Sequence, residues 1–327
     1  MKAILQRSFG GAEVLKLEDL PDPHPATGEV RIRVASAGVH FADTVNRRGI
    51  KAGPGPHPIL PFIPGREVAG IIDEVAHDVD RSWIGRRVVT HLSQECGGYA
   101  EFALADFKSL HQISPNLEFD EAVTMVGTGR TALAVLETAE PRDDDVVIVT
   151  ASAGGIGSLL IQGLRESAKT VVALAGGIEK VTFLRSLGVP YVVDYSTDGW
   201  VDAASAILGP QKASLVLDGV GGTIGRQTLQ LLGVRGRLVM FGSSSGNLIE
   251  LSSKDFFERG ISAVSAIGAR LINRAGGLHS LESLAIEAVT IGKLKPVIGG
   301  KLPLSEAATA HTLLESRESR GKVVLNP

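Results

Sequence analysis

The 327-residue sequence has a single cysteine, Cys96, and this scarcity excludes a disulfide within the chain. It also lacks any apolar run of the roughly 18 residues that a membrane-spanning helix requires, and its first residues lack the apolar stretch of a secretory signal. Neither sign of charge dominates, since 33 Lys and Arg stand against 36 Asp and Glu. Without a basic excess, the usual signature of nucleic-acid binding is missing. We therefore expect a reduced, cytoplasmic protein that binds neither membranes nor nucleic acid.

The first part of the chain, to about residue 120, predicts a β-rich domain. Residues 29–39, EVRIRVASAGV, alternate polar and apolar side chains with the period of a half-buried strand. Residues 67–76 and 85–92 show the same pattern. Proline and glycine interrupt the chain at 20–28 and 52–65, which predicts long surface loops there.

From about residue 120 the pattern changes to buried strands alternating with helices. Residues 119–139 have helical spacing, and the apolar run 144–150 is typical of a parallel strand buried on both faces. Further strands are predicted at 170–176, 191–195, 214–222 and 236–242, with helices at 158–168, 178–188 and 223–232. This order predicts a Rossmann-type, doubly wound parallel sheet over residues 122–265. Residues 1–121 and 266–327 are predicted to form the other domain, with a helix at 278–294 and a terminal strand at 321–327.

The segment TASAGGIGS, residues 150–158, follows one of these buried strands and opens a helix. Its Ala151, Gly154 and Gly157 have the A-x-x-G-x-x-G spacing of a dinucleotide-binding turn. Such a turn needs a sharp bend, a close backbone approach to the pyrophosphate and tight packing of helix on strand. The free N–H groups at the start of the helix then face the phosphates. The segment therefore predicts a bound dinucleotide.

The end of the second strand indicates which nicotinamide cofactor is bound. An NAD site usually has an acid there for the ribose 2′-hydroxyl, whereas this strand ends in ALAGG, residues 173–177. Lys180 follows, and its ammonium suits a 2′-phosphate, which favours NADP(H). Glu179 lies beside it, so NAD stays open as the alternative.

Several motifs together resemble one known family over essentially the whole chain. They are PGREVAG (64–70), GGYAEFALA (97–105), GRTALAVL (129–136), TASAGGIGS, GRLVMFG (236–242) and the tail LLESRESRGKVVLNP (313–327). On these motifs the chain resembles the medium-chain dehydrogenase/reductase superfamily, most closely its zinc-free quinone oxidoreductase branch. The resemblance implies a β-rich, GroES-like catalytic domain beside a Rossmann domain. It also implies hydride transfer from NADPH to a quinone or to the double bond of an α,β-unsaturated carbonyl.

The resemblance also implies positions for the cofactor. Ala151, Gly154, Gly155, Ile156 and Gly157 would contact the pyrophosphate, and Gly176, Lys180, Tyr195 and Arg317 would surround the 2′-phosphate. Thr128, Val220, Phe241, Gly242 and Ser243 would lie near the rest of the cofactor. A homodimer is expected as well, through a strand near residues 262–267.

A metal is not expected. Where zinc members of the superfamily have their first cysteine ligand this chain has His40, and where they have a histidine it has Arg66. An arginine cannot lose its proton to bind a metal, and a structural zinc site needs four cysteines. His40, His57 and His91 fit no ligand spacing and are interpreted as surface or hydrogen-bonded residues.

The stretch HFADTVNRRGIKAGP, residues 40–54, departs from the branch it resembles. Asp43 is kept, but Val45 and Lys51 stand where relatives carry aromatic residues, which questions a simple benzoquinone substrate. Reduction of an enone builds negative charge on its oxygen, and histidine exchanges protons near neutral pH. We therefore take His40, Asp43 and Arg130 as the candidate catalytic residues. For His40, contact with substrate or cofactor and the absence of any role stay open.

Three functions stay open at this point. The first is an NADPH-dependent, zinc-independent reductase of quinones or enones. The second is a reductase of a specialised acyl-thioester or natural-product enone, to which Arg47, Arg48 and Lys51 would offer positive charge. The third is a non-catalytic NADPH-binding or sensing protein.

Overall fold

A computed structural model describes residues 1–50, 59–92 and 97–327, and these form two compact units. The first unit comprises Met1–Arg130 and His279–Pro327, and the second comprises Thr131–Leu278. The chain passes between the compact units after Arg130 and after Leu278, somewhat later than the predicted limits after residues 121 and 265. Those predicted domain boundaries stay a prediction. Two helices, α3 (Arg130–Ala139) and α10 (Gly277–Thr290), begin where the chain passes from one unit to the other.

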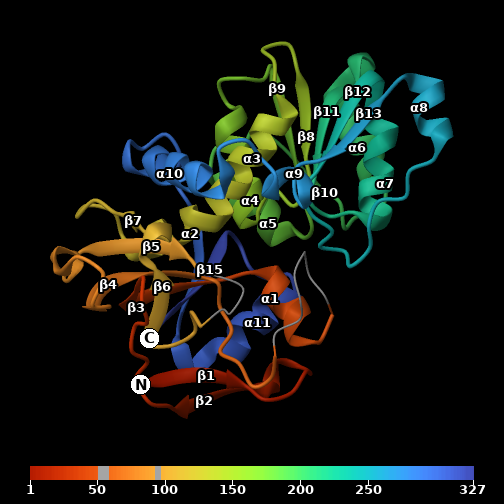
Figure 1. The fold of residues 1–327 in the computed structure, drawn as a ribbon. Helices are drawn as coiled ribbons and strands as arrows, with labels where there is room; N and C mark the ends of the chain where they lie inside the picture. Colours follow the sequence, from red (N-terminus) through yellow and green to blue (C-terminus); the bar gives the residue numbers. More distant parts are fainter. Residues whose placement is uncertain (51–58, 93–96) are drawn as a thin grey trace. The chain divides into compact units, whose positions relative to one another are not determined.

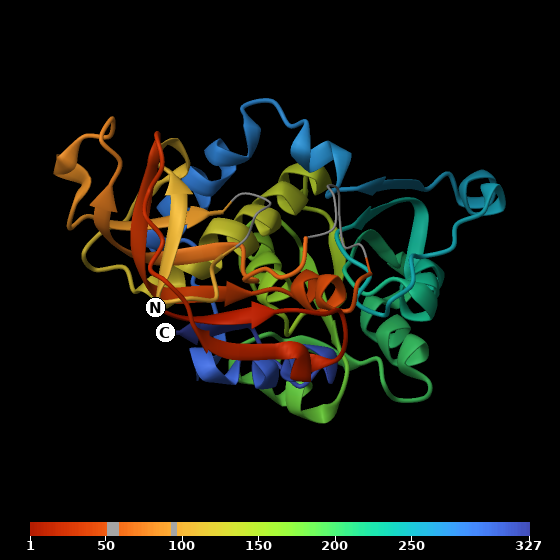
Figure 2. The same cartoon turned by 60° about the horizontal axis from the view of Figure 1, so that its bottom comes forward.

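The first unit is built on a seven-stranded sheet in the order β14-β15-β3-β4-β5-β7, with β6 also paired to β3. The 11-residue strand β3 (Glu29–Val39) forms, as its alternating pattern predicts. It pairs antiparallel with β15 (Lys322–Asn326) on one side and with β4 (Glu67–Val75) on the other, so the last strand of the chain adjoins one of its first (Figure 1). The remaining strands are β5 (Arg87–His91), β6 (Phe102–Asp106), β7 (His111–Gln112), β14 (Ile298–Pro303), and the separate hairpin β1 (Lys2–Gln6) and β2 (Leu15–Asp19), which Figure 2 brings forward.

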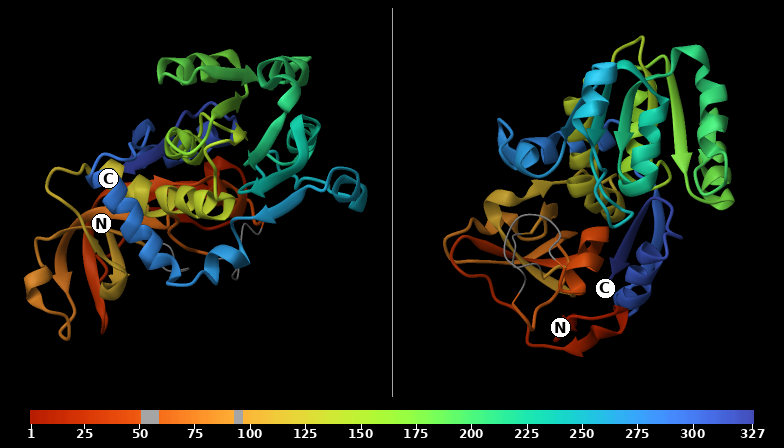
Figure 3. Two further views of the ribbon diagram at one scale, coloured as in Figure 1. Left: turned by 90° about the horizontal axis from the view of Figure 1, so that it is seen from above. Right: turned by 90° about the vertical axis from the view of Figure 1, so that its right-hand side faces the viewer.

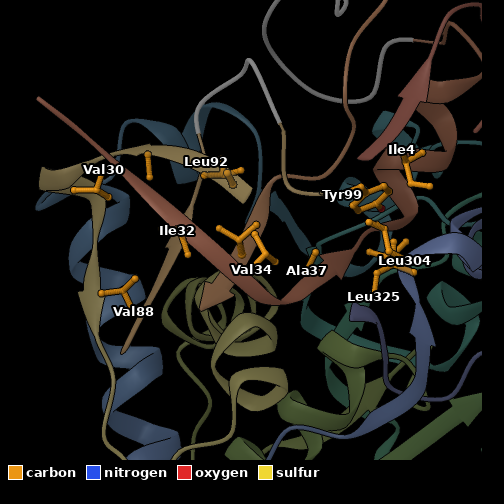
Figure 4. Packing of buried hydrophobic residues seen from close by; sticks show 14 of the residues in the cluster. Ile4, Val30, Ile32, Val34, Ala37, Val88, Leu92, Tyr99, Leu304 and Leu325 are labelled. Carbon is orange, nitrogen blue, oxygen red and sulfur yellow. The ribbon is translucent and has the colours of Figure 1, made fainter. Parts of the chain in front are cut away.

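The core of this unit gathers apolar side chains from strands that are distant in sequence. Figure 4 shows Ile32 and Val34 of β3, Tyr99, and Leu325 of β15 in the same cluster. Short helices complete the unit: α1 (Phe41–Arg47), α2 (Phe119–Thr124), α11 (Ala307–Glu315), and 3-10 turns at Ala12–Val14, Arg81–Trp83, Phe107–Ser109 and Leu304–Glu306.

The second unit is a six-stranded parallel sheet in the order β10-β9-β8-β11-β12-β13. Its strands are β8 (Val146–Val149), β9 (Thr170–Ala175), β10 (Tyr191–Asp194), β11 (Ala213–Asp218), β12 (Leu232–Met240) and β13 (Ser262–Ser265). The intervening helices are α4 (Gly155–Leu164), α5 (Ile178–Ser186), α6 (Trp200–Leu208), α7 (Gly222–Leu231) and α8 (Ser253–Arg259), with a 3-10 turn at Gly209–Gln211, and α9 (Ala269–Ile272) follows the last strand. Figure 3 follows this alternation from yellow-green to light blue. The predicted α/β class with a Rossmann-type parallel sheet is confirmed.

Two expectations about elements need correction. The helix predicted over 119–139 is interrupted by a π-helical turn, η4 (Met125–Gly129), where two glycines allow the backbone to widen. Helix α6 was not predicted at all, although Trp200, Ala204 and Leu208 recur at helical spacing and are buried.

Within the described ranges, no helix combines the length and the apolar character that crossing a membrane requires.

The buried histidine of α11 predicts a pH dependence of stability. Burial lowers the pKa of His311 to about 4, from 6.5, and its Nε2 lies 3.2 Å from the hydroxyl of Tyr99. Between these pH values the unfolded chain binds a proton that the folded chain does not. The free energy of unfolding should therefore fall as the pH drops from about 6.5 towards 4, by at most about 1.4 kcal/mol per pH unit from this group.

Denaturant titrations at several pH values measure that slope. The variant His311→Gln should flatten it, whereas His77→Gln, a change at an exposed histidine, should not. An unchanged slope in His311→Gln would show that His311 has the same protonation state in the folded and in the unfolded chain.

Candidate functional site

The turn between β8 and α4 has the geometry that a dinucleotide requires. Ala151 adopts a positive φ of 50°, and the N–H of Ser152 donates to the carbonyl of Leu174 at 3.1 Å, which ties the turn to β9. A Cβ on Gly157 would lie 2.3 Å from the carbonyl oxygen of Ala151, so only glycine fits there. Gly154 is the N-cap of α4, and Gly155 and Ile156 begin the helix with N–H groups free of helical partners.

The strand order reverses at β8, with β9 on one side and β11 on the other, which is where open parallel sheets bind ligands. Buried Asp218 lies at the carboxyl end of β11 and hydrogen-bonds to the residues around it. Its carboxylate accepts hydrogen bonds from the Thr150 hydroxyl at 2.7 Å and from the N–H groups of Val220 at 3.1 Å and Gly221 at 2.9 Å. Burial raises the pKa of Asp218, although these donors oppose the rise.

The residues that follow β12 lie beside those that end and follow β11. The N–H of Phe241 donates to the carbonyl of Asp218 at 2.8 Å, and a Cβ on Gly242 would lie 2.8 Å from the carbonyl oxygen of Gly219. The structure thus brings Val220, Phe241, Gly242 and the following Ser243 to one edge of the sheet. Their contact with a cofactor stays a prediction.

The end of β9 carries no acid, as the sequence indicates. A Cβ on Gly176 would lie 2.8 Å from Cε2 of Tyr195, so these two predicted residues are neighbours. Lys180 lies in the first turn of α5. Asp194, which ends the neighbouring strand β10, accepts from the N–H of Gly177 at 2.8 Å and from Ser196, and Glu179 lies beside Lys180 in the first turn of α5. Arg317, the other predicted 2′-phosphate residue, belongs to the first unit, where it follows α11 with φ at 60°.

The first unit contains a buried charged cluster around His40. The ammonium of Lys322 lies 3.0 Å from Oε2 of Glu67, 2.9 Å from Nε2 of His40 and 3.3 Å from Oγ1 of Thr128. Nε2 of His40 also lies 2.6 Å from Oε1 of Glu67. The side chains of Glu67 and Lys322 are 0% and 4% exposed, whereas that of His40 is 28% exposed. His40 is therefore the accessible end of a buried ion pair.

Two glycines make room for this ion pair. Glu67 begins β4 and Lys322 begins β15, on either side of β3, and Gly38 of β3 lies between them. A Cβ on Gly38 would lie 2.4 Å from Oε2 of Glu67, and one on Gly127 would lie 1.4 Å from Oε1. Burial alone would raise the pKa of Glu67, but His40, when protonated, and Lys322 hold that pKa well below its usual range. The carboxylate is thus ionised inside the unit.

Arg130, a predicted catalytic residue, belongs to a neighbouring cluster. Its guanidinium lies 2.6 Å from Oε1 of Glu282, whose Oε2 lies 3.1 Å from Nε2 of His111. Burial lowers the pKa of His91 to about 4, and the charge of Arg130 acts in the same direction. The structure therefore gives Arg130 a partner in an ion pair, and its catalytic role stays a prediction.

Asp43 and Arg47 also make contacts within the first unit that stabilise its fold. The carboxylate of Asp43 accepts from the N–H of His40 at 2.9 Å, capping α1, and from the Tyr99 hydroxyl at 3.2 Å. Arg47 was expected at a positively charged surface, but it is buried and lies 2.6 Å from Oε1 of Glu315. Lys51, His57 and Cys96 lie outside the described residues, so nothing tests the interpretations given to them.

The side chains present do not fit a zinc ion. Nε2 of His40, the nitrogen nearest Glu67, already faces the ammonium of Lys322, and a second cation there would be repelled. Arg66 stands where a second ligand would be needed. In the described part of the chain, no three histidine, cysteine or acidic side chains converge as metal ligands.

Sequence reasoning missed Glu67 and Lys322, although both have a readable signal. Glu67 opens a predicted strand, and Lys322 opens a terminal strand in which the next three residues are apolar. A charge at the start of a buried strand needs a partner, and the sequence does not say which one.

Comparisons with known proteins agree with this geometry. Residues 187–325 match the family model described as zinc-binding dehydrogenase, and residues 26–115 match that of the alcohol dehydrogenase GroES-like domain. The quinone oxidoreductase of Sus scrofa is 31% identical, over 99% of this chain and 97% of its own length. A 2-haloacrylate reductase from Burkholderia sp is 28% identical, over 100% of this chain and 99% of its own length.

Solved structures are similar over the whole chain. A structure titled NAD-dependent alcohol dehydrogenase has a TM-score of 0.88 and 30% identity, with 100% of both chains covered. The Escherichia coli quinone oxidoreductase complexed with NADPH has a TM-score of 0.88 and 26% identity, again with 100% of both chains covered.

A substitution at Gly127 tests the geometry of the charged cluster. In Gly127→Ala the new methyl group would overlap Oε1 of buried Glu67, and neither partner can move without exposing or separating charge. We expect the free energy of unfolding to fall by about 2 kcal/mol or more. The matched control is Gly129→Ala, whose Cβ would meet the end of Met125, at 2.6 Å, and the Cβ of Ala285, at 3.3 Å, but no charged atom, and should cost less than the change at Gly127. Equal costs in the two variants would contradict the placement of Glu67.

Proposed function

The chain belongs to the quinone oxidoreductase branch of the medium-chain dehydrogenase/reductase superfamily, and from that premise we propose that it is an NADPH-dependent, zinc-independent reductase of quinones or α,β-unsaturated carbonyls. Membership makes it an oxidoreductase acting on a small molecule. The observation that carries the finer proposal is an accessible imidazole, His40, held by a buried ion pair in the GroES-like unit.

The cofactor is NADP(H), the form with which the Escherichia coli relative was solved. The residues at the end of β9 fit this cofactor. Gly176 and Gly177 carry no carboxylate that would repel a 2′-phosphate, and Asp194 of β10 accepts from the N–H of Gly177. Lys180 lies in the first turn of α5, next to Glu179. We propose that the glycines of the β8–α4 turn hold the pyrophosphate and that Lys180 and Tyr195 receive the 2′-phosphate.

The bound cofactor supplies a hydride, so the protein must supply position, charge stabilisation and one proton. Hydride addition to the β-carbon of an enone, or to a quinone, leaves negative charge on a carbonyl oxygen. We propose that His40 donates a hydrogen bond to that oxygen and then transfers the proton. Asp43 supports it by fixing the backbone N–H of His40 at the start of α1.

Zinc is not needed in this scheme, because the positive charge near His40 is the ammonium of Lys322. The relative named 2-haloacrylate reductase supports activated alkenes as one substrate class, and the relatives named quinone oxidoreductase support quinones as the other. The specialised acyl-thioester alternative loses support from Arg47, which is buried and paired with Glu315.

A screen of NADPH oxidation tests the proposal. The panel contains 1,4-benzoquinone, 9,10-phenanthrenequinone, short 2-alkenals, 2-chloroacrylate and an enoyl thioester, each with and without a chelator and with NADH in parallel. We expect turnover of a quinone or an activated alkene, preference for NADPH and no effect of the chelator. His40→Ala should lower kcat about a hundredfold with little change in the KM for NADPH.

Other outcomes would decide against it. Loss of activity in the chelator would contradict zinc independence. Tight NADPH binding without turnover of any substrate would instead favour the cofactor-sensing alternative, and turnover unchanged in His40→Ala would remove the proposed role of that residue.

We further propose a homodimer formed through β13, the last strand of the parallel sheet, whose free edge can pair with its copy about a two-fold axis. Analytical ultracentrifugation at micromolar concentration should show a dimer. A monomer there, or a dimer that the substitution Ala263→Pro leaves unchanged, would contradict this interface.

A further inference from the structure

The side chain of half-buried Arg66, the residue before β4, forms no hydrogen bond and no ion pair with any described residue. The other buried or half-buried arginines in the described part of the first unit all donate to a carboxylate, a carbonyl or an amide oxygen. They are Arg31, Arg47, Arg86, Arg87 and Arg130. A cation that has lost part of its water and gained no acceptor is unfavourable, so its presence indicates a ligand from outside the chain.

The two ends of the Arg66 guanidinium have different surroundings. Nε is enclosed and has no acceptor among the described residues. Arg66 also lines, with Gln6, Asp43 and Asn46, a cavity of about 10 Å³, which has room for one water-sized group and not for an organic anion. Nη1 and Nη2 likewise have no partner in the described ranges, but they are not enclosed. A ligand can therefore reach these two nitrogens from the solvent.

Asp43, the acid among the residues that line the cavity, does not pair with Arg66. Its carboxylate accepts from the N–H of His40 at 2.9 Å and from the hydroxyl of Tyr99 at 3.2 Å. No ion pair joins it to the guanidinium, although both residues line the same small cavity. The terminal nitrogens of Arg66 therefore stay available to an anion.

The main chain places Arg66 beside the cluster around His40. The carbonyl of Arg66 accepts from the N–H of Leu92 at 2.7 Å, which holds its backbone against the end of β5. The next residue, Glu67, lies 2.6 Å from Nε2 of His40, and Asp43 bonds to the backbone of the same histidine. Arg66 and His40 thus share two neighbours within the first unit, and a small molecule held by one lies close to the other.

We propose that Arg66 binds the carboxylate of the substrate, and that the substrates of this protein include small α,β-unsaturated carboxylic acids. The two oxygens of a carboxylate match the spacing of two N–H groups of a guanidinium, so the contact is bidentate. This inference rests on the proposed function, within which it names a substrate class. The binding of a carboxylate by Arg66 does not itself depend on turnover.

The guanidinium also suits the charge that develops as such an acid is reduced. A C–H bond forms at the β-carbon as it gains the hydride, and the carbon–carbon π bond breaks. The electron pair of that bond moves onto the α-carbon and the carboxylate, whose existing negative charge is thereby increased. Arg66 stabilises this added charge. The α-carbon then takes a proton from water, so the alkene is reduced and the bound NADPH is oxidised to NADP⁺.

Kinetics with 2-chloroacrylate and its methyl ester form the first arm of the test, because esterification removes the charge and keeps the alkene. Arg66→Gln should lower kcat/KM for the acid about a hundredfold, and for the ester by less than about threefold. Each variant is compared with the parent protein on the same substrate, since the ester is intrinsically more reactive. Arg66→Lys keeps the charge without the paired donors and should lose less on the acid than Arg66→Gln.

The matched control is Arg33→Gln, which removes an exposed arginine of β3 and should leave kcat/KM for both substrates unchanged. Turnover of the ester also shows that Arg66→Gln is folded. If Arg66→Gln does not fold, Arg66→Lys takes its place, with a loss expected on the acid alone.

Binding without turnover forms the second arm. The probe is propionate, added at constant ionic strength to the whole protein saturated with NADP⁺, and the signals followed by NMR are those of the arginine Nε–H groups. The loss of one signal in Arg66→Gln or Arg66→Lys identifies that of Arg66. We expect this signal to shift saturably, in the millimolar range, with propionate and not with the neutral propionamide. Arg33→Gln should keep the shift.

The outcomes separate this inference from the proposed function. The absence of a shift, or a shift that propionamide reproduces, overturns the inference even if quinones or enals are reduced. An equal loss on acid and ester in Arg66→Gln overturns it in favour of a structural role, and a raised KM for NADPH with the ester makes a cofactor phosphate the partner of Arg66 instead. If no substrate is reduced, the proposed function fails, and the propionate titration alone decides whether Arg66 binds a carboxylate.

Discussion

The first unit depends on the ion pair between Glu67 and Lys322. The two residues begin strands that flank β3, and the carboxylate and ammonium meet over Gly38, where the middle strand has no side chain. Neither charge is accessible to water, so each needs the other, and removing one would leave an uncompensated buried charge. The pair therefore links β15 to β4 across β3, and both of its side chains also contact the ring of His40.

The second unit also depends on a buried carboxylate, that of Asp218, but hydrogen bonds rather than an opposite charge hold it. Among the described residues no cation pairs with the buried carboxylate of Asp218, which accepts instead from one hydroxyl and two backbone N–H groups. These bonds hold the ends of β8 and β11 together at the point where the strand order reverses. The turn that should receive the pyrophosphate begins at Thr150, one of those donors, so the cofactor turn and the sheet edge are ordered together.

The sequence predicts the parallel sheet and its glycine turn well, because both depend on local patterns: apolar runs such as residues 144–150, and the spacing of Ala151, Gly154 and Gly157. It does not predict the π-helical turn at Met125–Gly129 or the cluster behind His40. Glu67 and Lys322 are separated by most of the chain, and only the folded sheet brings them together. Asp43 and Arg130 were chosen for their charge. The partner of Asp43, the N–H of His40, is only three residues away in the same capping turn, whereas Glu282, the partner of Arg130, is 152 residues away and is brought close only by folding.

The central claim is that Glu67 and Lys322 act as one unit, and a double-mutant cycle of unfolding free energies tests it most directly. We predict that Glu67→Gln and Lys322→Met each cost about 3–5 kcal/mol, and that the double variant costs no more than the worse single change. Such a result would give a coupling energy of several kcal/mol between the two side chains. Costs that simply add, within about 0.5 kcal/mol, would show that the two residues act independently and would contradict the account.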